Sequence, residues 1–279
     1  MFGAILGDII GSAYEFDAYN CKSKDFPLFS RRSTFTDDTV MTLAVADALM
    51  KVGPEDGDDV IRAELVRSMQ SIGRHYPYCG YGRRFIQWMF SDSPQPYDSC
   101  GNGSGMRVSP AAWFFNDLET VLRMARLTAD VSHNHPEGVK GAQAVASAIF
   151  LARSGKSKED IRAFITERFG YDLDRTCDEI RPNYHHVETC QKSVPEAIIA
   201  FLEGTGFEDV IRTAVSIGGD SDTIADMAGA IAEAFYGVPE NLKRECRAHL
   251  PEELRDILER AESGIVGCER TDRISGQQS

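Results

Sequence analysis

Apolar side chains recur at intervals of three and four residues along most of the chain, and alanine-rich stretches are common. This spacing predicts helices, because it gathers the apolar residues on one face of a 3.6-residue turn. Runs with the alternation typical of β-strands are almost absent. The pattern therefore predicts a helical protein.

Four stretches carry the strongest helical signal: 1–16, 40–49, 138–153 and about 223–236. The first is apolar except for Asp8, lacks a basic leader and is too short to span a bilayer, so we expect a buried helix. The second is entered directly from residues 37–39, whose side-chain oxygens can cap it. The last two are apolar or small on nearly every side, which predicts central helices.

The segments between these helices are rich in turn-forming residues, notably in 76–82, 91–96, 101–105 and 133–136. Loops of this kind on a rigid helical body are where ligand contacts usually concentrate. No low-complexity linker divides the chain and no tandem repeat is visible. We expect one domain over residues 1–269, followed by a polar, frayed tail over 270–279.

Charge and cysteine content narrow the function classes. The 279 residues include 43 acidic and 30 basic side chains, a formal net charge of −13, which disfavours general nucleic-acid binding because it repels a polyphosphate backbone. The seven cysteines lie far apart and form no C-x-x-C pair. This predicts reduced thiols in a soluble cytoplasmic protein that does not enter the membrane.

Two acidic clusters stand at helix entrances: Thr36-Asp37-Asp38-Thr39 and Gly218-Gly219-Asp220-Ser221-Asp222-Thr223. Hard divalent cations prefer carboxylate, hydroxyl and water oxygens, so two such clusters can converge on a pair of ions. The alternative is ordinary helix capping, which stabilises a helix by about 1 kcal/mol for each cap. One aspartate suffices for a cap, and neighbouring acids repel each other. The residues alone leave metal binding and capping open.

Three weaker signals accompany the clusters. The glycine-rich segment 101–105 can expose backbone N–H groups to phosphate oxygens, although an ordinary tight turn is the simpler interpretation of the isolated pattern. His133 and His135 lie in a proline-containing loop, where a histidine is more often a structural hydrogen-bond partner than a catalyst. Glu15 by itself has the properties of a surface acid.

Taken together and in this order, the motifs resemble the ADP-ribosylglycohydrolase family, which includes dinitrogenase reductase-activating glycohydrolase and the ADP-ribosyl-arginine and ADP-ribosyl-serine hydrolases. Six motifs in the family's order are far more specific than any one alone, and the resemblance runs from the N-terminal helix to Gly237. The resemblance is carried by Gly7-Asp8 with Gly11 and Glu15, Thr36-Asp37-Asp38-Thr39, Gly80-Tyr81-Gly82, Gly101-Asn102-Gly103-Ser104 with Met106-Arg107, Ser132-His133, and Gly218-Gly219-Asp220-Ser221-Asp222-Thr223.

The resemblance implies an all-α fold, a compact orthogonal helical bundle whose central cleft holds two Mg²⁺ ions, or Mn²⁺. Thr36, Asp37 and Asp38 would bind one ion and Asp220 and Thr223 the other, with Asp222 between them. Glu15, on a loop that is mobile in the family, and Asp38 would be catalytic. The ligand-binding residues would be Gly80, Tyr81, Gly82, Gly101, Asn102, Gly103, Ser104, Gly105 and His133.

Two positions depart from the family pattern. Gly105 stands where alanine or another side chain is common, which loosens the glycine-rich loop and keeps its N–H donors. Ser132 stands where threonine is common, and it keeps the hydroxyl.

The implied activity is hydrolysis of the glycosidic bond between ADP-ribose and an arginine or serine side chain of a modified protein, by a monomeric enzyme that releases ADP-ribose. Metal-bound ribose hydroxyls and an activated water would start the reaction, which would pass through an oxocarbenium-like state. Two alternatives stay open: a non-catalytic ADP-ribose-binding or crystallin-like protein on the same scaffold, and a metal-dependent phosphohydrolase. Acceptor choice would depend on the cleft rim, for which the candidates are Tyr14, Phe16, Tyr19 and Trp113.

Overall fold

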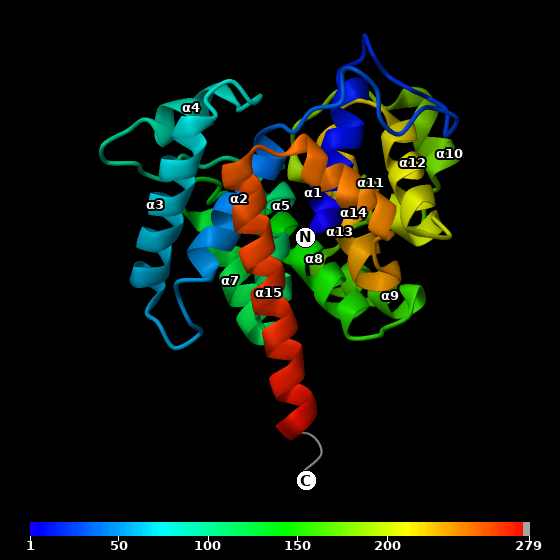
Figure 1. The fold of residues 1–279 in the computed structure, drawn as a ribbon. Helices are drawn as coiled ribbons and strands as arrows, with labels where there is room; N and C mark the ends of the chain where they lie inside the picture. The colour runs from blue at the N-terminus through cyan, green and yellow to red at the C-terminus, as the bar shows by residue number, and fades with distance from the viewer. Residues whose placement is uncertain (276–279) are drawn as a thin grey trace.

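Helices form all the regular structure in residues 1–275, the part of the chain that this computed structural model describes (Figure 1). Within those residues one isolated bridge, between Gly101 and Thr189, is the only β-pairing, so the predicted all-α class is confirmed. The elements are α1 (Phe2–Gly11), η1 (Ser12–Tyr14), α2 (Asp37–Leu49), α3 (Asp58–His75), α4 (Arg83–Met89), α5 (Gly103–Met106), α6 (Ser109–Phe114), α7 (Leu118–Asp130), α8 (Pro136–Arg153), α9 (Lys158–Phe169), α10 (Cys177–Ile180), η2 (Arg181–Asn183), α11 (Cys190–Glu203), α12 (Phe207–Ile217), α13 (Ser221–Tyr236), α14 (Glu240–His249) and α15 (Glu252–Ser275).

The N-terminal helix α1 lies inside the bundle and packs most extensively on α13 (Figure 1). All ten residues of α1 are buried, which confirms the predicted buried helix. The two backbones touch because glycines face the contact: a Cβ on Gly7 would lie 2.1 Å from the carbonyl oxygen of Ala225, and one on Gly3 would lie 2.1 Å from that of Gly229. This close approach brings Asp8 of α1 beside the first turn of α13.

The predicted central helices occupy the middle of the molecule. α8 packs against α5, α6, α7, α9, α11 and α13, and α13 packs against α1, α8, α11 and α12. Residues 221–232 of α13 are all buried, in agreement with the small and apolar character of the sequence. Figure 1 shows α3 and α4 on one side of this centre and α10 and α12 on the other. The first turns of α2 and α13 therefore meet in the interior.

The start of α2 differs from its prediction. Residues 37–39 were expected to precede and cap the helix, but the helix begins at Asp37, and the N-cap is Thr36, whose side chain accepts a hydrogen bond from the Asp38 N–H at 3.3 Å. The prediction failed because Asp8, far away in sequence, accepts hydrogen bonds from Thr36 and Thr39 and draws both residues towards α1.

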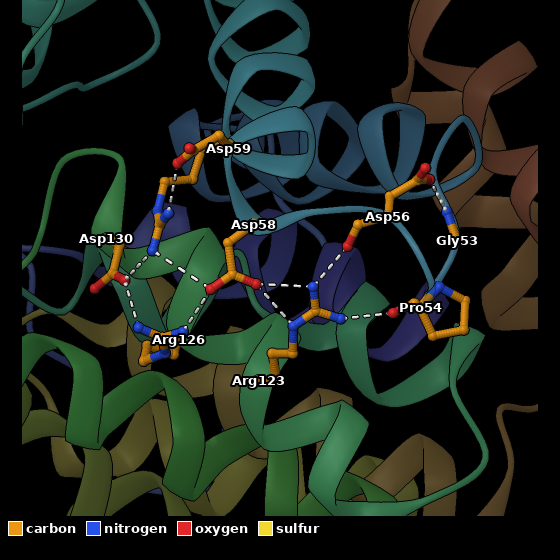
Figure 2. Close-up of polar contacts among 9 residues, drawn as sticks. Gly53, Pro54, Asp56, Asp58, Asp59, Arg123, Arg126 and Asp130 are labelled. Atoms are coloured by element: carbon orange, nitrogen blue, oxygen red, sulfur yellow. Dashed lines mark hydrogen bonds and ion pairs between the residues drawn. The ribbon is translucent and has the colours of Figure 1, made fainter.

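A polar network fixes the N-terminal end of α3 to α7 (Figure 2). The Asp58 carboxylate pairs with Arg123 and Arg126 of α7, at 2.7 and 2.9 Å. Arg123 also donates to the backbone carbonyls of Pro54 and Asp56, at 2.6 and 2.7 Å. One arginine thus ties both the loop before α3 and the first turn of α3 to α7.

The C-terminal helix α15 runs to Ser275, so residues 270–275 of the predicted tail are helical and 276–279 lie outside the described residues. Cys21, Cys79, Cys100, Cys177, Cys190 and Cys246 are free thiols. The side chain of Cys268 lies outside the described part. Among the described helices, none is both long enough and apolar enough to cross a membrane.

Candidate active site

A cavity of about 300 Å³ opens where the first turns of α2 and α13 meet. One wall is acidic and comes from the two predicted clusters together with Glu15. The other wall comes from the glycine-containing segments before α4 and α5 and from the start of α4. The lining residues are Glu15, Asp37, Asp38, Gly80, Gly82, Arg83, Arg84, Phe85, Tyr97, Ser99, Gly101, Asn102, Gly103, Met106, Arg107, His133, Glu188, Asp220, Asp222 and Thr223.

Carboxylates from opposite ends of the sequence lie together on the acidic wall. One oxygen from each of Asp8, Asp38 and Asp222 lies within 4.8 Å of the others, and so do ligand atoms of Glu15, His186 and Asp220. Asp38, Asp220 and Asp222 are each at most 4% exposed. The two motifs, far apart in the sequence, therefore form one site.

Asp8, on α1, accepts hydrogen bonds from the residues at the start of α2. One of its oxygens accepts from the Thr36 hydroxyl at 2.7 Å, and the other accepts from the backbone N–H groups of Thr36 and Thr39, at 2.8 and 3.1 Å, and from the Thr39 hydroxyl. The carboxylate is fully buried. Because its lone pairs already serve these donors, Asp8 positions the start of α2 and so sets the place of Asp38.

A strained turn sets the place of Glu15. The next residue, Phe16, has a left-handed backbone with φ 66°, which is costly for a side chain of this size. Its N–H donates to the carbonyl of Gly219 at 3.0 Å, and its ring packs on His186 with centroids 4.9 Å apart. The turn therefore fastens Glu15 to the loop that leads into α13.

Burial raises the pKa of every carboxylic acid on this wall. It raises the pKa of Glu15 to about 7 and that of Asp8 to about 6, and it holds the pKa values of Asp37, Asp38 and Asp222 well above the usual range, with neighbouring carboxylates adding to the shift. Buried like charges are costly unless a cation or protons neutralise them.

The donor set fits hard divalent cations. One oxygen of Asp38 is buried and has no hydrogen-bond partner among the described residues, which leaves it free for another ligand. The wall offers carboxylates and the Thr223 hydroxyl, the oxygen donors that Mg²⁺ and Mn²⁺ accept. The Asn102 side-chain amide donates to Asp220 at 2.5 Å and so helps to fix its position.

The glycine-rich segment is not wholly a loop. Gly103–Met106 forms the short helix α5, with Asn102 as its N-cap residue. Three N–H groups of the segment are already used, since Gly101 donates to the Ser99 hydroxyl, Asn102 to the Glu188 carbonyl and Gly105 to the Asn102 carbonyl. Gly101 and Gly103 line the cavity, whereas Ser104 is buried and its hydroxyl donates to the carbonyl of Gly138 at 2.8 Å. Gly105 is also buried and is absent from the cavity lining.

The second glycine segment contributes its two glycines and not its aromatic residue. Gly80 and Gly82 line the cavity. Tyr81 is 6% exposed, stacks on Phe85 with centroids 5.6 Å apart and is absent from the lining. The segment is fixed to α2, because the Asp37 N–H donates to the Cys79 carbonyl at 2.7 Å.

The two histidines of the proline-containing loop have different positions. His135 caps α8, since its ring nitrogen accepts from the Glu137 N–H at 3.1 Å. His133 is 6% exposed and lines the cavity. Burial lowers its pKa well below the usual value, and the nearby charges of Arg107 and Arg84 lower it further.

Some predicted residues lie away from the cavity surface. Thr36 is not in the lining, and its hydroxyl is within hydrogen-bond distance of Asp8 at 2.7 Å and of Asp38 at 3.3 Å. Four rim candidates are also absent from it: Tyr14, Phe16, Tyr19 and Trp113. Tyr14 donates to the Pro27 carbonyl at 2.8 Å and so belongs to the core, whereas Phe16 and Tyr19 are exposed.

Other residues of the site escaped the sequence analysis. Asp8 was recognised as part of a motif and not as a member of the carboxylate group, although a lone acid in an apolar helix is itself a signal. His186 and Glu188 come from the loop before α11, and Arg83 and Arg84 from the start of α4. These four occur in segments without a distinctive pattern, and only the fold brings them to the cavity.

The chain resembles known proteins in sequence and in fold. The family model for ADP-ribosylglycohydrolase matches residues 1–273. The ADP-ribosylhydrolase ARH3 of Homo sapiens is 28% identical, over 92% of this chain and 89% of that protein. The ADP-ribosylarginine hydrolase Tri1 of Pseudomonas putida strain GB-1 is also 28% identical, over 85% of this chain and 70% of that protein. A solved structure titled "ADP-ribosylglycohydrolase-related protein complex" superposes with a TM-score of 0.66 at 23% identity, covering 92% of this chain and 94% of that one, and shares the fold.

Proposed function

The chain belongs to the ADP-ribosylglycohydrolase family, and on that premise we propose that it is a metal-dependent hydrolase that cleaves the glycosidic bond between ADP-ribose and an acceptor side chain, releasing ADP-ribose. The observation that carries the proposal is the meeting of Asp38 and Asp222 on one wall of a cavity whose other wall presents Gly101, Gly103 and His133. ADP-ribose suits this lining, because its distal ribose is joined directly to a diphosphate: the carboxylates would take the ribose side and the donors of the other wall the diphosphate.

The metal ions are assigned to the acidic wall. Asp37 and Asp38, with Thr36 beside them, would hold one ion, and Asp220 and Thr223 would hold the other, with Asp222 between them. Two Mg²⁺ or Mn²⁺ ions bound there would orient the hydroxyls of the distal ribose and lower the pKa of a water molecule. The unpartnered oxygen of Asp38 and the raised pKa values of the wall support this assignment.

Glu15 and Asp38 are the proposed catalytic residues. The Glu15 carboxyl lines the cavity, and burial raises its pKa to about 7, so near neutrality it can both accept and return a proton. Protonation of the departing acceptor atom and removal of a proton from water both need such a group. The ionised Asp38 would stabilise the positive charge that develops on the ribose.

The residues of the other wall would bind the ligand and support the metal ligands. The Gly103 N–H and the N–H groups of the Gly80–Gly82 segment would hold the diphosphate oxygens. Asn102 would keep Asp220 in place through its 2.5 Å hydrogen bond. We assign the acceptor to arginine or serine of an ADP-ribosylated protein partner, and we place the enzyme, as a monomer, in the cytoplasm.

The test is incubation with arginine-linked, serine-linked and nucleic-acid-linked ADP-ribose, with and without EDTA. Free ADP-ribose should be released from one of the protein-type substrates, and EDTA should stop the release. Asp38→Asn and Asp222→Asn should abolish turnover, while Asp59→Asn, which removes a fully exposed charge on α3, should leave it unchanged.

Other products would assign other functions. AMP and ribose phosphate would identify a phosphohydrolase. ADP-ribose binding in calorimetry with no turnover of any substrate would identify a non-catalytic binding protein. Full activity of the Asp38→Asn, Asp222→Asn double variant would end the proposed mechanism.

A further inference from the structure

We propose that Arg107 and Ser132 form a hydrogen-bonded relay that fixes the tautomer and orientation of His133, so that its Nε2–H is presented as a donor to ligand oxygen atoms in the cavity. The inference deepens the proposed function, since ADP-ribose is the ligand that it concerns. Arg107 and Ser132 act through His133 and are positioning residues.

The relay is a continuous chain of short contacts. Arg107 Nη2 donates to the Ser132 hydroxyl oxygen at 2.7 Å and to the Thr128 carbonyl at 2.8 Å. The Ser132 hydroxyl lies 2.8 Å from Nδ1 of His133. Arg107 and Ser132 are both fully buried and His133 is 6% exposed, so bulk water does not compete for these contacts.

The available hydrogen atoms determine which group donates in each hydrogen bond of the relay. A guanidinium only donates, so the Ser132 oxygen accepts from Arg107. The serine hydroxyl has one hydrogen, and among the described residues the His133 ring is the other group within its reach. If that hydrogen is directed at Nδ1, then Nδ1 is an acceptor and the ring carries its proton on Nε2. The reverse assignment would leave a buried hydroxyl hydrogen without an acceptor.

The surroundings keep the ring neutral. The charged and titratable groups that face it are Arg107 below, Arg84 from α4, and the Tyr97 ring, whose centroid lies 5.6 Å from that of His133. Both arginines disfavour a second positive charge on the imidazole. In the described structure Nε and Nη1 of Arg107 are buried without hydrogen-bond partners. No carboxylate among the described residues forms an ion pair with Arg107, and its positive charge disfavours protonation of His133.

The free nitrogen of the ring lies at the glycine-rich segment. A Cβ on Gly103 would lie 3.1 Å from Nε2 of His133, and one on Gly101 would lie 3.3 Å from it. The two glycines therefore leave the space in front of Nε2 open. A neutral Nε2–H there can share a phosphate or ribose oxygen with the Gly103 N–H, whereas a deprotonated Nε2 would repel that oxygen.

The first experiment reads the tautomer directly. Long-range ¹H–¹⁵N correlation spectra of histidine-labelled, ligand-free protein report which nitrogen carries the proton, and His133→Gln identifies the signals of His133 among the six histidines. We expect the Nε2–H pattern from pH 6 to pH 8.5. Ser132→Thr keeps the hydroxyl and should keep this pattern. Ser132→Val has the shape of threonine without the hydroxyl, and it should lose the single tautomer.

The second experiment links the tautomer to binding. Calorimetry with ADP-ribose should give a dissociation constant about 10-fold higher for Ser132→Val than for the wild type, and one within about 2-fold of it for Ser132→Thr. If Ser132→Val does not fold, as judged by circular dichroism, Ser132→Ala takes its place in both measurements.

Several outcomes would overturn the inference. An Nδ1–H tautomer or an imidazolium in the wild type at pH 7 would do so, and so would wild-type spectra and affinity in the valine variant. If Ser132→Val alters the tautomer of His133 but leaves the affinity for ADP-ribose unchanged, the relay exists and has no role in ligand binding. If the wild type does not bind ADP-ribose, the proposed function fails, while the spectra of the ligand-free protein still decide whether the relay exists.

Discussion

Replacing Asp226 by alanine should stabilise the protein. Asp226 lies on α13, one turn after Asp222, and is 0% exposed. Neither of its oxygens has a hydrogen-bond partner among the described residues, and burial holds its pKa well above the usual value, with the Asp8 charge adding to the shift. Folding therefore removes this carboxyl group from water and gives it no partner in return.

Three effects set the size of the change. Removing an unpartnered buried polar group gains about 1–3 kcal/mol. Alanine in a helix interior adds up to about 0.7 kcal/mol over aspartate. The shortened side chain leaves a void of roughly 20–30 Å³, which at about 24 cal/mol per Å³ costs about 0.5–0.7 kcal/mol. We expect Asp226→Ala to raise the free energy of unfolding by about 1–3 kcal/mol.

The gain should depend on pH, and its sign follows from the pKa. A carboxyl group whose pKa is higher in the folded state contributes no penalty below its unfolded pKa, near 3.8, and destabilises the fold increasingly as the pH rises. The advantage of alanine should therefore be larger at pH 8.5 than at pH 6. Urea unfolding of the metal-free protein in EDTA, followed by circular dichroism, measures both values.

A matched control separates burial from charge. Ser147 on α8 is also 0% exposed and its hydroxyl also lacks a partner among the described residues, but it does not titrate. Ser147→Ala should therefore change stability by the same amount at both pH values. The reasoning is refuted if Asp226→Ala is less stable than the wild type at pH 8.5, or if its gain is equal at pH 6 and pH 8.5.

Three shorter predictions follow from other parts of the structure. Glu15→Gln should lower kcat by about 10²–10⁴-fold with little change in ADP-ribose affinity, and equal kcat in a steady-state assay would exclude Glu15 as the proton-transfer group. Because burial raises the pKa of Glu15 from 4.5 to about 7, the metal-free protein should lose stability as the pH rises between these values. Mg²⁺ at 100 times its dissociation constant should raise the free energy of unfolding by about 2.7 kcal/mol. A melting curve that Mg²⁺ leaves unchanged would contradict this. Arg123→Ala removes the hydrogen bonds to Pro54 and Asp56 and should lower the free energy of unfolding by about 1–2 kcal/mol, measured by urea titration.

The fold was predictable where burial dominates the sequence. α1, α8 and α13 are apolar or small on most sides, and any arrangement that exposed them would lose the hydrophobic contribution, so their central position follows from composition. The start of α2 was not predictable locally. Its boundary depends on Asp8, and a hydrogen bond between residues 28 positions apart has no signature in the residues around Thr36.

Some residues of the candidate site were also predictable from the sequence and others were not. The clusters that contain Asp38 and Asp222 were recognisable, because acidic residues at the entrances of buried helices are costly without a ligand, and in the structure their carboxylates meet. Ser104 and Tyr81 matched motifs yet point into the core, since a motif fixes residue order and not the direction of a side chain. His186 depends on the path of a loop, which no local pattern encodes.

The cavity also explains how a chain with a net charge of −13 can accept the anionic ligand proposed for it. Net charge governs long-range repulsion, which salt screens beyond about 10 Å. Inside the cavity the local charges matter more, and Arg83, Arg84 and the buried Arg107 line it together with the carboxylates of α2 and α13. A long polyphosphate would meet the net negative charge of the chain along its length, whereas a single diphosphate would contact only the groups that line the cavity. The net charge that disfavours nucleic-acid binding is thus compatible with the proposed ligand ADP-ribose, whose diphosphate the three arginines would attract.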